Sequence, residues 1–130
     1  MLLQFPHETG CMLAVDDDGR VAYAYLHAPD GDIIGDVWLY NRVATPPTPD
    51  WSTPPFLNAA SHAKPLDQPP PDRPDDLTVE WTVDGELLLA DVFLRGVLLA
   101  RLSPGAQPGW NVLATQRGPC ALPFDDDEAP

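Results

Sequence analysis

Residues 77–102 read LTVEWTVDGELLLADVFLRGVLLARL, which is three apolar runs separated by two turns that contain glycine. The first turn, Asp84-Gly85, joins two residue types that tolerate positive φ, as both central positions of a type I′ hairpin require. The second turn, Arg95-Gly96, carries a weaker form of the same signal. Two successive hairpins predict a three-stranded antiparallel meander over residues 77–102.

A two-residue loop at each turn fixes which residues are neighbours across the strands. The two loops predict these pairs: Val83 with Glu86, Trp81 with Leu88, Val79 with Ala90, Leu77 with Val92, Leu94 with Val97, and Val92 with Leu99. Because successive side chains point to opposite faces of a strand, one face of this meander is almost wholly apolar. The other face, which includes Ala100 and Leu102, is polar on the first strand and apolar under the last two. This pattern is typical of a sheet with one face in a core and part of the other face covered.

Residues 11–41 repeat the layout. Their apolar runs, residues 11–15, 21–26 and 33–41, are separated by an aspartate-rich stretch at 16–19 and a loop at 28–32. Val, Tyr, Trp and Ile, which favour strands, recur in these runs. The sequence therefore predicts an all-β fold in which two antiparallel three-stranded meanders pack as a sandwich or a partly closed barrel.

A long proline-rich segment, residues 42–76, joins the two meanders. Its many prolines favour an extended chain, because proline fixes φ and restricts the residue before it. Trp51 and Phe56 within it predict that the segment packs on or beside the sheet. We expect further C-terminal strands within residues 103–124, at 110–115 and 121–124, and an acidic tail at 125–130. The length of 130 residues indicates a single domain over 1–130.

The chain carries 20 acidic and 7 basic side chains, a formal net charge of −13. Such a charge repels nucleic acids and anionic membranes, which bind proteins through Lys and Arg, and it attracts a basic protein. No apolar run approaches the ~20 residues that span a bilayer, and the first ten residues lack the regions of a secretory signal. We therefore expect a cytoplasmic protein with Cys11 and Cys120 reduced.

The sequence offers little for catalysis. It contains none of the glycine-rich or serine motifs that mark nucleotide sites and hydrolases, and its three histidines, His7, His27 and His62, lack metal-ligand spacing. We expect no metal and no cofactor. The catalytic candidates are Glu80 and Asp91, which the predicted register makes diagonal neighbours on one face. Two carboxyls at that range can separate their pKa values and act as acid and base.

The sequence favours a non-enzymatic acidic binding protein. Aromatic and polar side chains that suit a protein interface gather at Trp38, Tyr40, Arg42, Asp50 and Trp51. The most concrete form of this prediction is a bacterial inhibitor of the immunity type, which neutralises a basic protein partner. One alternative is a small-molecule-binding β-barrel with hydrolase or isomerase activity, which needs a concave pocket. Another is a module that forms homo-oligomers through an exposed edge strand.

Overall fold

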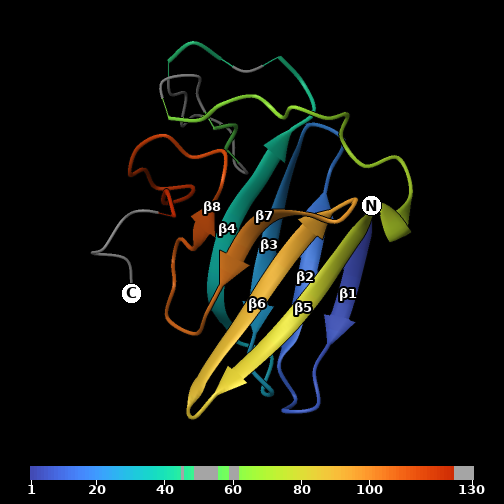
Figure 1. Ribbon diagram of the computed structural model, residues 1–130, viewed down its shortest axis with the longest axis vertical. Helices are drawn as coiled ribbons and strands as arrows, with labels where there is room; N and C mark the ends of the chain where they lie inside the picture. The colour runs from blue at the N-terminus through green and yellow to red at the C-terminus, as the bar shows by residue number, and fades with distance from the viewer. Residues whose placement is uncertain (45, 49–55, 59–61, 125–130) are drawn as a thin grey trace.

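The computed structural model describes residues 1–44, 46–48, 56–58 and 62–124. Within these residues the fold is two four-stranded antiparallel sheets packed face to face (Figure 1). The first sheet holds, in chain order, β1 (Leu2–Pro6), β2 (Met12–Asp17), β3 (Val21–His27) and β4 (Ile33–Asn41). The second holds β5 (Leu77–Asp84), β6 (Leu87–Leu94), β7 (Val97–Leu102) and β8 (Trp110–Asn111). One turn of 3-10 helix, Pro74–Asp76, precedes β5.

The predicted all-β architecture of two antiparallel meanders is confirmed, and the two sheets form a sandwich. Each meander gains a fourth strand: β1, which we did not predict, pairs with β2, and β8 pairs with β7. The strand expected at 110–115 is only two residues long, and the one expected at 121–124 is reduced to a single bridge between Trp110 and Leu122. The described chain has no helix with the length and hydropathy needed to cross a membrane.

The first hairpin of the second sheet turns one residue later than predicted. Its loop is Gly85-Glu86, so Asp84 pairs with Leu87 and Trp81 pairs with Ala90. Gly85 has φ +62°, which suits the first central position of a type II′ turn and leaves Asp84 in the strand. The predicted pairs of Val83 with Glu86 and of Trp81 with Leu88 are therefore wrong. Each partner moves by two positions, so the inward and outward faces of β5 and β6 remain as predicted.

The second hairpin forms as predicted at its turn and departs from the prediction one residue further on. Arg95 and Gly96 have φ of +47° and +80°, and Leu94 pairs with Val97. A β-bulge then makes Val92 pair with Ala100 instead of Leu99. The extra residue reverses the facing of the rest of β7. Ala100 and Leu102 therefore lie fully buried in the core, against the prediction, and Arg101 points outward.

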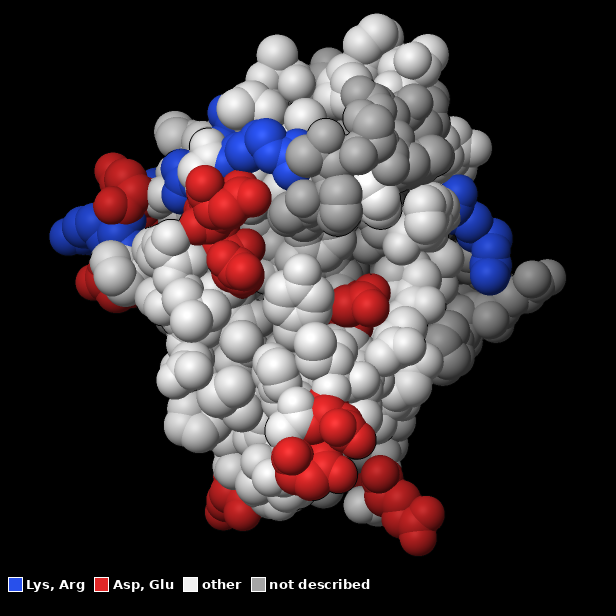
Figure 2. Space-filling model, turned by 180° about the vertical axis from the view of Figure 1, so that it is seen from behind, with Lys and Arg blue, Asp and Glu red and all other residues white. Residues whose placement is uncertain are grey.

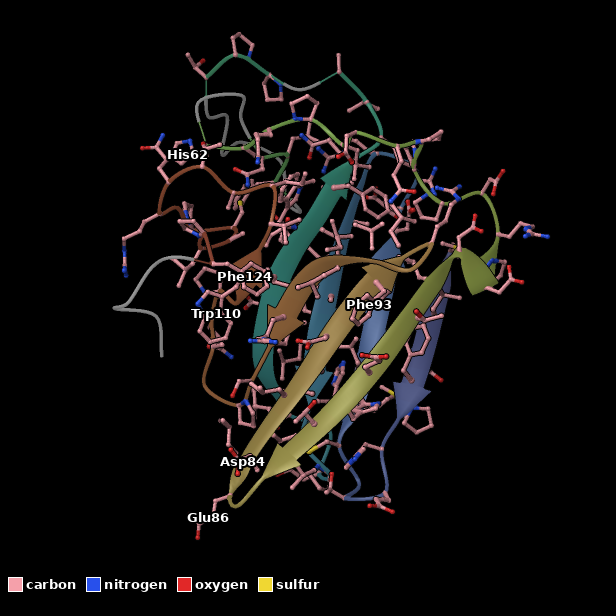
Figure 3. All side chains as sticks on the ribbon, viewed as in Figure 1. His62, Asp84, Glu86, Phe93, Trp110 and Phe124 are labelled. Carbon is pink, nitrogen blue, oxygen red and sulfur yellow. The ribbon has the colours of Figure 1, made fainter. Side chains whose placement is uncertain are left out.

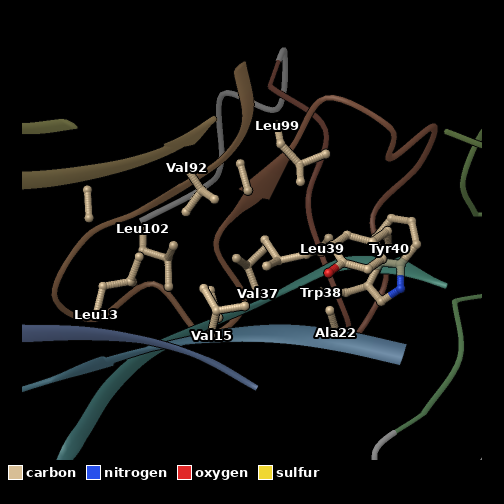
Figure 4. Close-up of a cluster of buried hydrophobic side chains, with 14 of the residues drawn as sticks. Leu13, Val15, Ala22, Val37, Trp38, Leu39, Tyr40, Val92, Leu99 and Leu102 are labelled. Carbon is tan, nitrogen blue, oxygen red and sulfur yellow. The ribbon is translucent and has the colours of Figure 1, made fainter. Parts of the chain in front are cut away.

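The core lies between the two sheets and is built by the inward residues of both. Leu13, Val15 and Val37 from the first sheet are fully buried, as are Val92 and Leu102 from the second (Figure 4). Burying one such side chain contributes about 1.5–3 kcal/mol. The core thus depends on the alternating apolar positions that the sequence shows in residues 11–41 and 77–102.

One side of the sandwich is closed by backbone hydrogen bonds between β4 and the C-terminal segment. The N–H of Asp36 donates to the carbonyl of Ala106 at 3.1 Å, and that of Trp38 donates to the carbonyl of Cys120 at 2.8 Å. The edge of β4 that does not pair with β3 is therefore occupied. On the opposite side, β1 and β5 are the edge strands of their sheets, and the rings of His7 and Trp81 contact each other at 4.8 Å between centroids.

Candidate functional site

Three of the five residues predicted to bind a partner are described by the structure. Trp38 and Tyr40 are 2 % and 0 % exposed, so their rings belong to the interior. The indole Nε1 of Trp38 donates to Oδ1 of Asn41 at 2.8 Å. Asp50 and Trp51 lie outside the described residues. Partner binding by Trp38, Tyr40, Arg42, Asp50 and Trp51 stays a prediction.

Tyr40 and Arg42 meet at a buried carboxylate that sequence reasoning placed in a turn. Asp17, 2 % exposed, accepts hydrogen bonds from the Tyr40 hydroxyl at 2.6 Å and from Arg42 Nε at 2.6 Å. A third comes from the N–H of Gly19 at 3.0 Å. The alternation of Leu13, Val15 and Asp17 along β2 was the signal that this side chain points inward.

The environment of Asp17 keeps it ionised. Burial acts to raise its pKa, but the hydrogen bonds from Tyr40, Gly19 and Arg42 outweigh burial, so the pKa is lowered. Burial and the contact with Asp17 together raise the pKa of the Tyr40 hydroxyl. Arg42 also donates to the carbonyl of Pro71 and so ties the proline-rich segment to β4. The acceptors of Asp17 are occupied within the protein, which indicates a structural role.

A cavity of about 210 Å³ lies beside this network. Trp38, Tyr40, Asn58 and Gln68 are among its lining residues. The side chain of Gln68 donates to the carbonyl of Leu94, and the backbone of Asn58 is hydrogen-bonded to the side-chain amide of Asn41. Small-molecule sites are commonly about 300–1,000 Å³, with polar groups free to orient a ligand. This cavity therefore gives the small-molecule alternative little support.

The two catalytic candidates face each other directly across β5 and β6, instead of diagonally as predicted, because of the shifted turn. Arg101 donates from Nε to Oδ1 of Asp91 at 2.7 Å and from Nη2 to Oδ2 at 3.0 Å. The hydrogen bond with Asp91 raises the pKa of Arg101. Glu80 is exposed on the sheet. Because Arg101 neutralises Asp91 and no enclosing wall surrounds Glu80, the geometry does not favour an acid–base role, which stays an untested prediction.

The described residues hold no group of three His, Cys, Asp or Glu side chains close enough together to bind a metal ion.

Acidic side chains gather at one end of the sandwich. The β1–β2, β3–β4 and β5–β6 turns all lie at this end, the lower end in Figure 1. Together these turns and the last residue of β5 carry Glu8, Asp30, Asp32, Asp84 and Glu86, and they contain no Lys or Arg. The same end seen from behind shows acidic residues without basic ones, whereas the basic residues lie higher (Figure 2). We call these five residues the acidic pole.

The outer face of the second sheet is apolar next to this pole. Its outward side chains on β6 to β8, joined by Phe124, form what we call the outer apolar face: Leu87, Leu89, Phe93, Leu98, Trp110 and Phe124. Figure 3 shows Trp110 and Phe124 lying close together, with Asp84 and Glu86 at the hairpin tip. A groove of about 320 Å³ runs between Leu87, Leu89, Trp110 and Phe124. The sequence predicted this face to be apolar under the last two strands, but it was not recognised as a candidate site.

Comparison with protein-family models found no match to this chain, and comparisons with curated proteins and with solved structures found none either.

Proposed function

We propose that this chain is a non-enzymatic binding protein for a basic protein partner, and that its most concrete role is that of an inhibitor of the immunity type. The observation that carries the proposal is the acidic pole, where five acidic side chains in or beside three hairpin turns share one end of the molecule without a Lys or Arg among them.

The distribution of ion pairs supports this function. At least four of the seven basic side chains are paired with carboxylates of the same chain: Arg42 with Asp17, Arg73 with Asp75, Arg95 with Asp76 and Asp72, and Arg101 with Asp91. None of these pairs includes a residue of the acidic pole. The five carboxylates of the pole, a quarter of the 20 in the chain, are thus not neutralised by these pairs. An excess of one sign at one end accelerates encounter with a partner of the opposite sign and fixes its orientation.

The other functions have less support. The cavity beside Asp17 is small and its polar lining is already hydrogen-bonded, which weakens the proposal of a small-molecule site. Self-association through β5 would bring two strongly acidic molecules together, which their net charge opposes. The cytoplasmic location expected from the sequence stays part of the proposal.

Affinity capture from the native host tests the function. The pole variant carries Asp32→Asn, Asp84→Asn and Glu86→Gln, all at exposed turn positions. The matched control, Asp16→Asn, Asp67→Asn and Asp75→Asn, removes the same charge from exposed positions outside the pole. We expect the wild type and the control to capture a protein with positive net charge, and the pole variant to lose it. Capture of acidic proteins only, or equal capture by both variants, would overturn the proposal.

A further inference from the structure

We infer that the outer apolar face is the surface on which the basic partner docks, with an apolar side chain of the partner in the groove beside Trp110 and its Lys or Arg side chains over the neighbouring carboxylates. This inference rests on the proposed function and adds to it the place and the chemistry of the contact.

The facing of the strands divides the outer surface of this sheet in two. On β5 the outward residues are polar: Thr78, Glu80, Thr82 and Asp84. On β6 they are Leu87, Leu89, Asp91 and Phe93, three of the four apolar. An antiparallel sheet with one face in water normally alternates apolar inward with polar outward residues. The apolar outward residues of β6 depart from that rule. Leu87 and Phe124 are exposed and Leu89 and Trp110 are half-buried around one groove, and apolar side chains gathered at the surface in this way are typical of an interaction site.

The groove has the composition of an interface centre. Trp110 and Phe124 line it together with Arg101, and Trp and Arg are enriched among residues that dominate binding energy. Leu87 is 48 % exposed and Phe124 is 37 % exposed, so a partner side chain can cover both. The groove crosses several strands of the sheet, because its lining comes from β6 (Leu87), β7 (Arg101), β8 (Trp110) and the segment after β8 (Phe124).

Arg101 belongs to the groove without making it cationic. Its guanidinium is neutralised by the two hydrogen bonds to Asp91, and its Cζ lies 5.6 Å from the centre of the Phe124 ring. The group therefore contacts both a carboxylate and an aromatic ring. An incoming Lys or Arg meets a neutral ion pair here instead of a free positive charge.

A rim of carboxylates borders the apolar face on one side. Glu80, Asp84 and Glu86 are exposed, and none of them takes part in the ion pairs of the described residues. Asp84 pairs with Leu87, so the rim begins one strand away from the apolar residues, about 5 Å. A partner segment that complements this surface carries a Lys or Arg within two or three residues of an apolar side chain.

The charge of the rim decides between possible occupants. A second copy of this chain would bring two acidic rims together, and each chain has a net charge of −13. A wholly apolar segment would leave the rim carboxylates uncompensated. A protein segment in which Lys or Arg alternates with apolar residues satisfies both the groove and the rim.

Synthetic heptapeptides serve as probes of defined chemistry. The first alternates lysine with leucine and phenylalanine, KLKFKLK; the second replaces its apolar residues by serine, KSKSKSK; the third reverses the charge, ELEFELE. Binding is measured by titration against the ¹⁵N-labelled full chain, with backbone shifts followed by NMR. We expect KLKFKLK to bind at least tenfold more tightly than either other peptide and to shift residues of β6, β7 and Trp110.

Two matched pairs of variants localise the contact. Leu87→Ser and Phe124→Ser change the outer apolar face, whereas Leu2→Ser and Ile33→Ser change side chains of similar exposure on the first sheet, 62 % and 49 %. The first pair should weaken binding of KLKFKLK at least tenfold, and the second should leave it unchanged. If Leu87→Ser or Phe124→Ser fails to fold, the rim variant Glu80→Gln, Asp84→Asn, Glu86→Gln replaces it and should weaken binding by at least the same factor.

The outcomes separate this inference from the proposed function. Equal binding of KLKFKLK and KSKSKSK, with shifts confined to the acidic pole, would overturn the docking surface and leave the proposed function intact. Equal binding of KLKFKLK and ELEFELE would overturn the role of the rim. If no peptide binds and the host yields no basic partner, both the inference and the proposed function fail.

Discussion

The side-chain amide of Asn111 donates a 2.6 Å hydrogen bond to the backbone carbonyl of Trp38 and so joins β8 of one sheet to β4 of the other. The same nitrogen donates to the carbonyl of Leu39 at 3.0 Å, and Oδ1 accepts from the N–H of Leu113 at 2.8 Å. Asn111 is fully buried. One polar side chain thus satisfies three backbone groups where the two sheets meet.

Removal of that amide should destabilise the fold strongly. Asn111→Ala leaves two carbonyls and one N–H buried without their partner, and we expect the free energy of unfolding to fall by about 2–4 kcal/mol. Urea denaturation followed by tryptophan fluorescence measures the change. The neighbouring Val112→Ala, at a residue 36 % exposed, is the control and should cost less than about 1 kcal/mol. Equal effects of the two substitutions would show that Asn111 does not hold the sheets together.

The buried network around Asp17 should depend on both of its side-chain donors. Tyr40→Phe removes one hydrogen bond to the carboxylate and should cost about 1–2 kcal/mol of unfolding free energy. Asp17→Asn leaves Arg42 without its counter-charge, and we expect a cost of about 2–4 kcal/mol. Thermal and urea denaturation of the single and double variants measure both. Tyr25→Phe, in a half-buried ring stacked on Tyr23, is the control, with an expected change within about 0.5 kcal/mol.

If the double variant Tyr40→Phe, Asp17→Asn loses the full sum of the two single costs, the residues act independently. We expect less than the sum, because Tyr40→Phe removes the hydrogen bond to residue 17 that Asp17→Asn weakens.

Acid should weaken the contact that fixes the start of β5. Hydrogen bonds with the Asp72 side chain and from the backbone N–H groups of Asp72 and Arg73 lower the pKa of Asp76 from 3.8 to about 2. Because the folded-state pKa lies below the unfolded one, ionised Asp76 stabilises the fold above about pH 4, and this contribution is lost as the pH falls toward 2.

The measurement is the melting temperature of the wild type and of Asp76→Asn between about pH 2 and pH 7. The difference between the two should be constant above about pH 5 and close to zero near pH 2. Asp75→Asn, at a side chain 77 % exposed, should show no such change. A difference for Asp76→Asn that stays constant down to pH 2 would contradict the assignment.

Gly109 should tolerate no side chain. A Cβ at this position would lie 2.5 Å from the backbone oxygen of Arg101, which cannot move without breaking β7. A Cβ at Gly118 would lie 2.9 Å from a carbon of the His62 ring, which is a side-chain contact and not a backbone one. We expect Gly109→Ala to lower the melting temperature far more than Gly118→Ala, in a direct comparison by differential scanning calorimetry. Similar melting temperatures would mean that the segment before β8 shifts freely.

Much of the fold could be predicted from local patterns. The turns of residues 77–102 and the alternation of apolar residues determine strand order and facing. The predicted strand order and the predicted facing of β5 and β6 are correct although the first turn lies one residue later than predicted. The bulge at Leu99 could not be predicted, because Leu99, Ala100 and Leu102 are all apolar and fit either face. β1 could not be predicted, because residues 2–6 form only a short run that ends in a proline. This strand forms because it pairs with β2, and that pairing is not visible in the local sequence.

The candidate site was harder to predict, because burial is not visible in composition. Trp38 and Tyr40 have the residue types of an interface, yet tertiary packing places both inside the protein. Conversely, Leu87 and Phe124 resemble core residues, and the facing of β6 and the path of the C-terminal segment expose them. The acidic pole depends on three turns that are far apart in sequence and meet only once both sheets have formed.

The backbone hydrogen bonds between the edge of β4 and the C-terminal segment can form only late in translation. Asn111, which contacts Trp38, is synthesised 73 residues after it. At typical elongation rates, β4 emerges from the ribosome roughly 4–15 s before the segment that covers it. During that interval the nascent N-terminal sheet presents a bare strand that can pair with a neighbouring chain. Translation that stops before residue 106 therefore releases a product prone to aggregate.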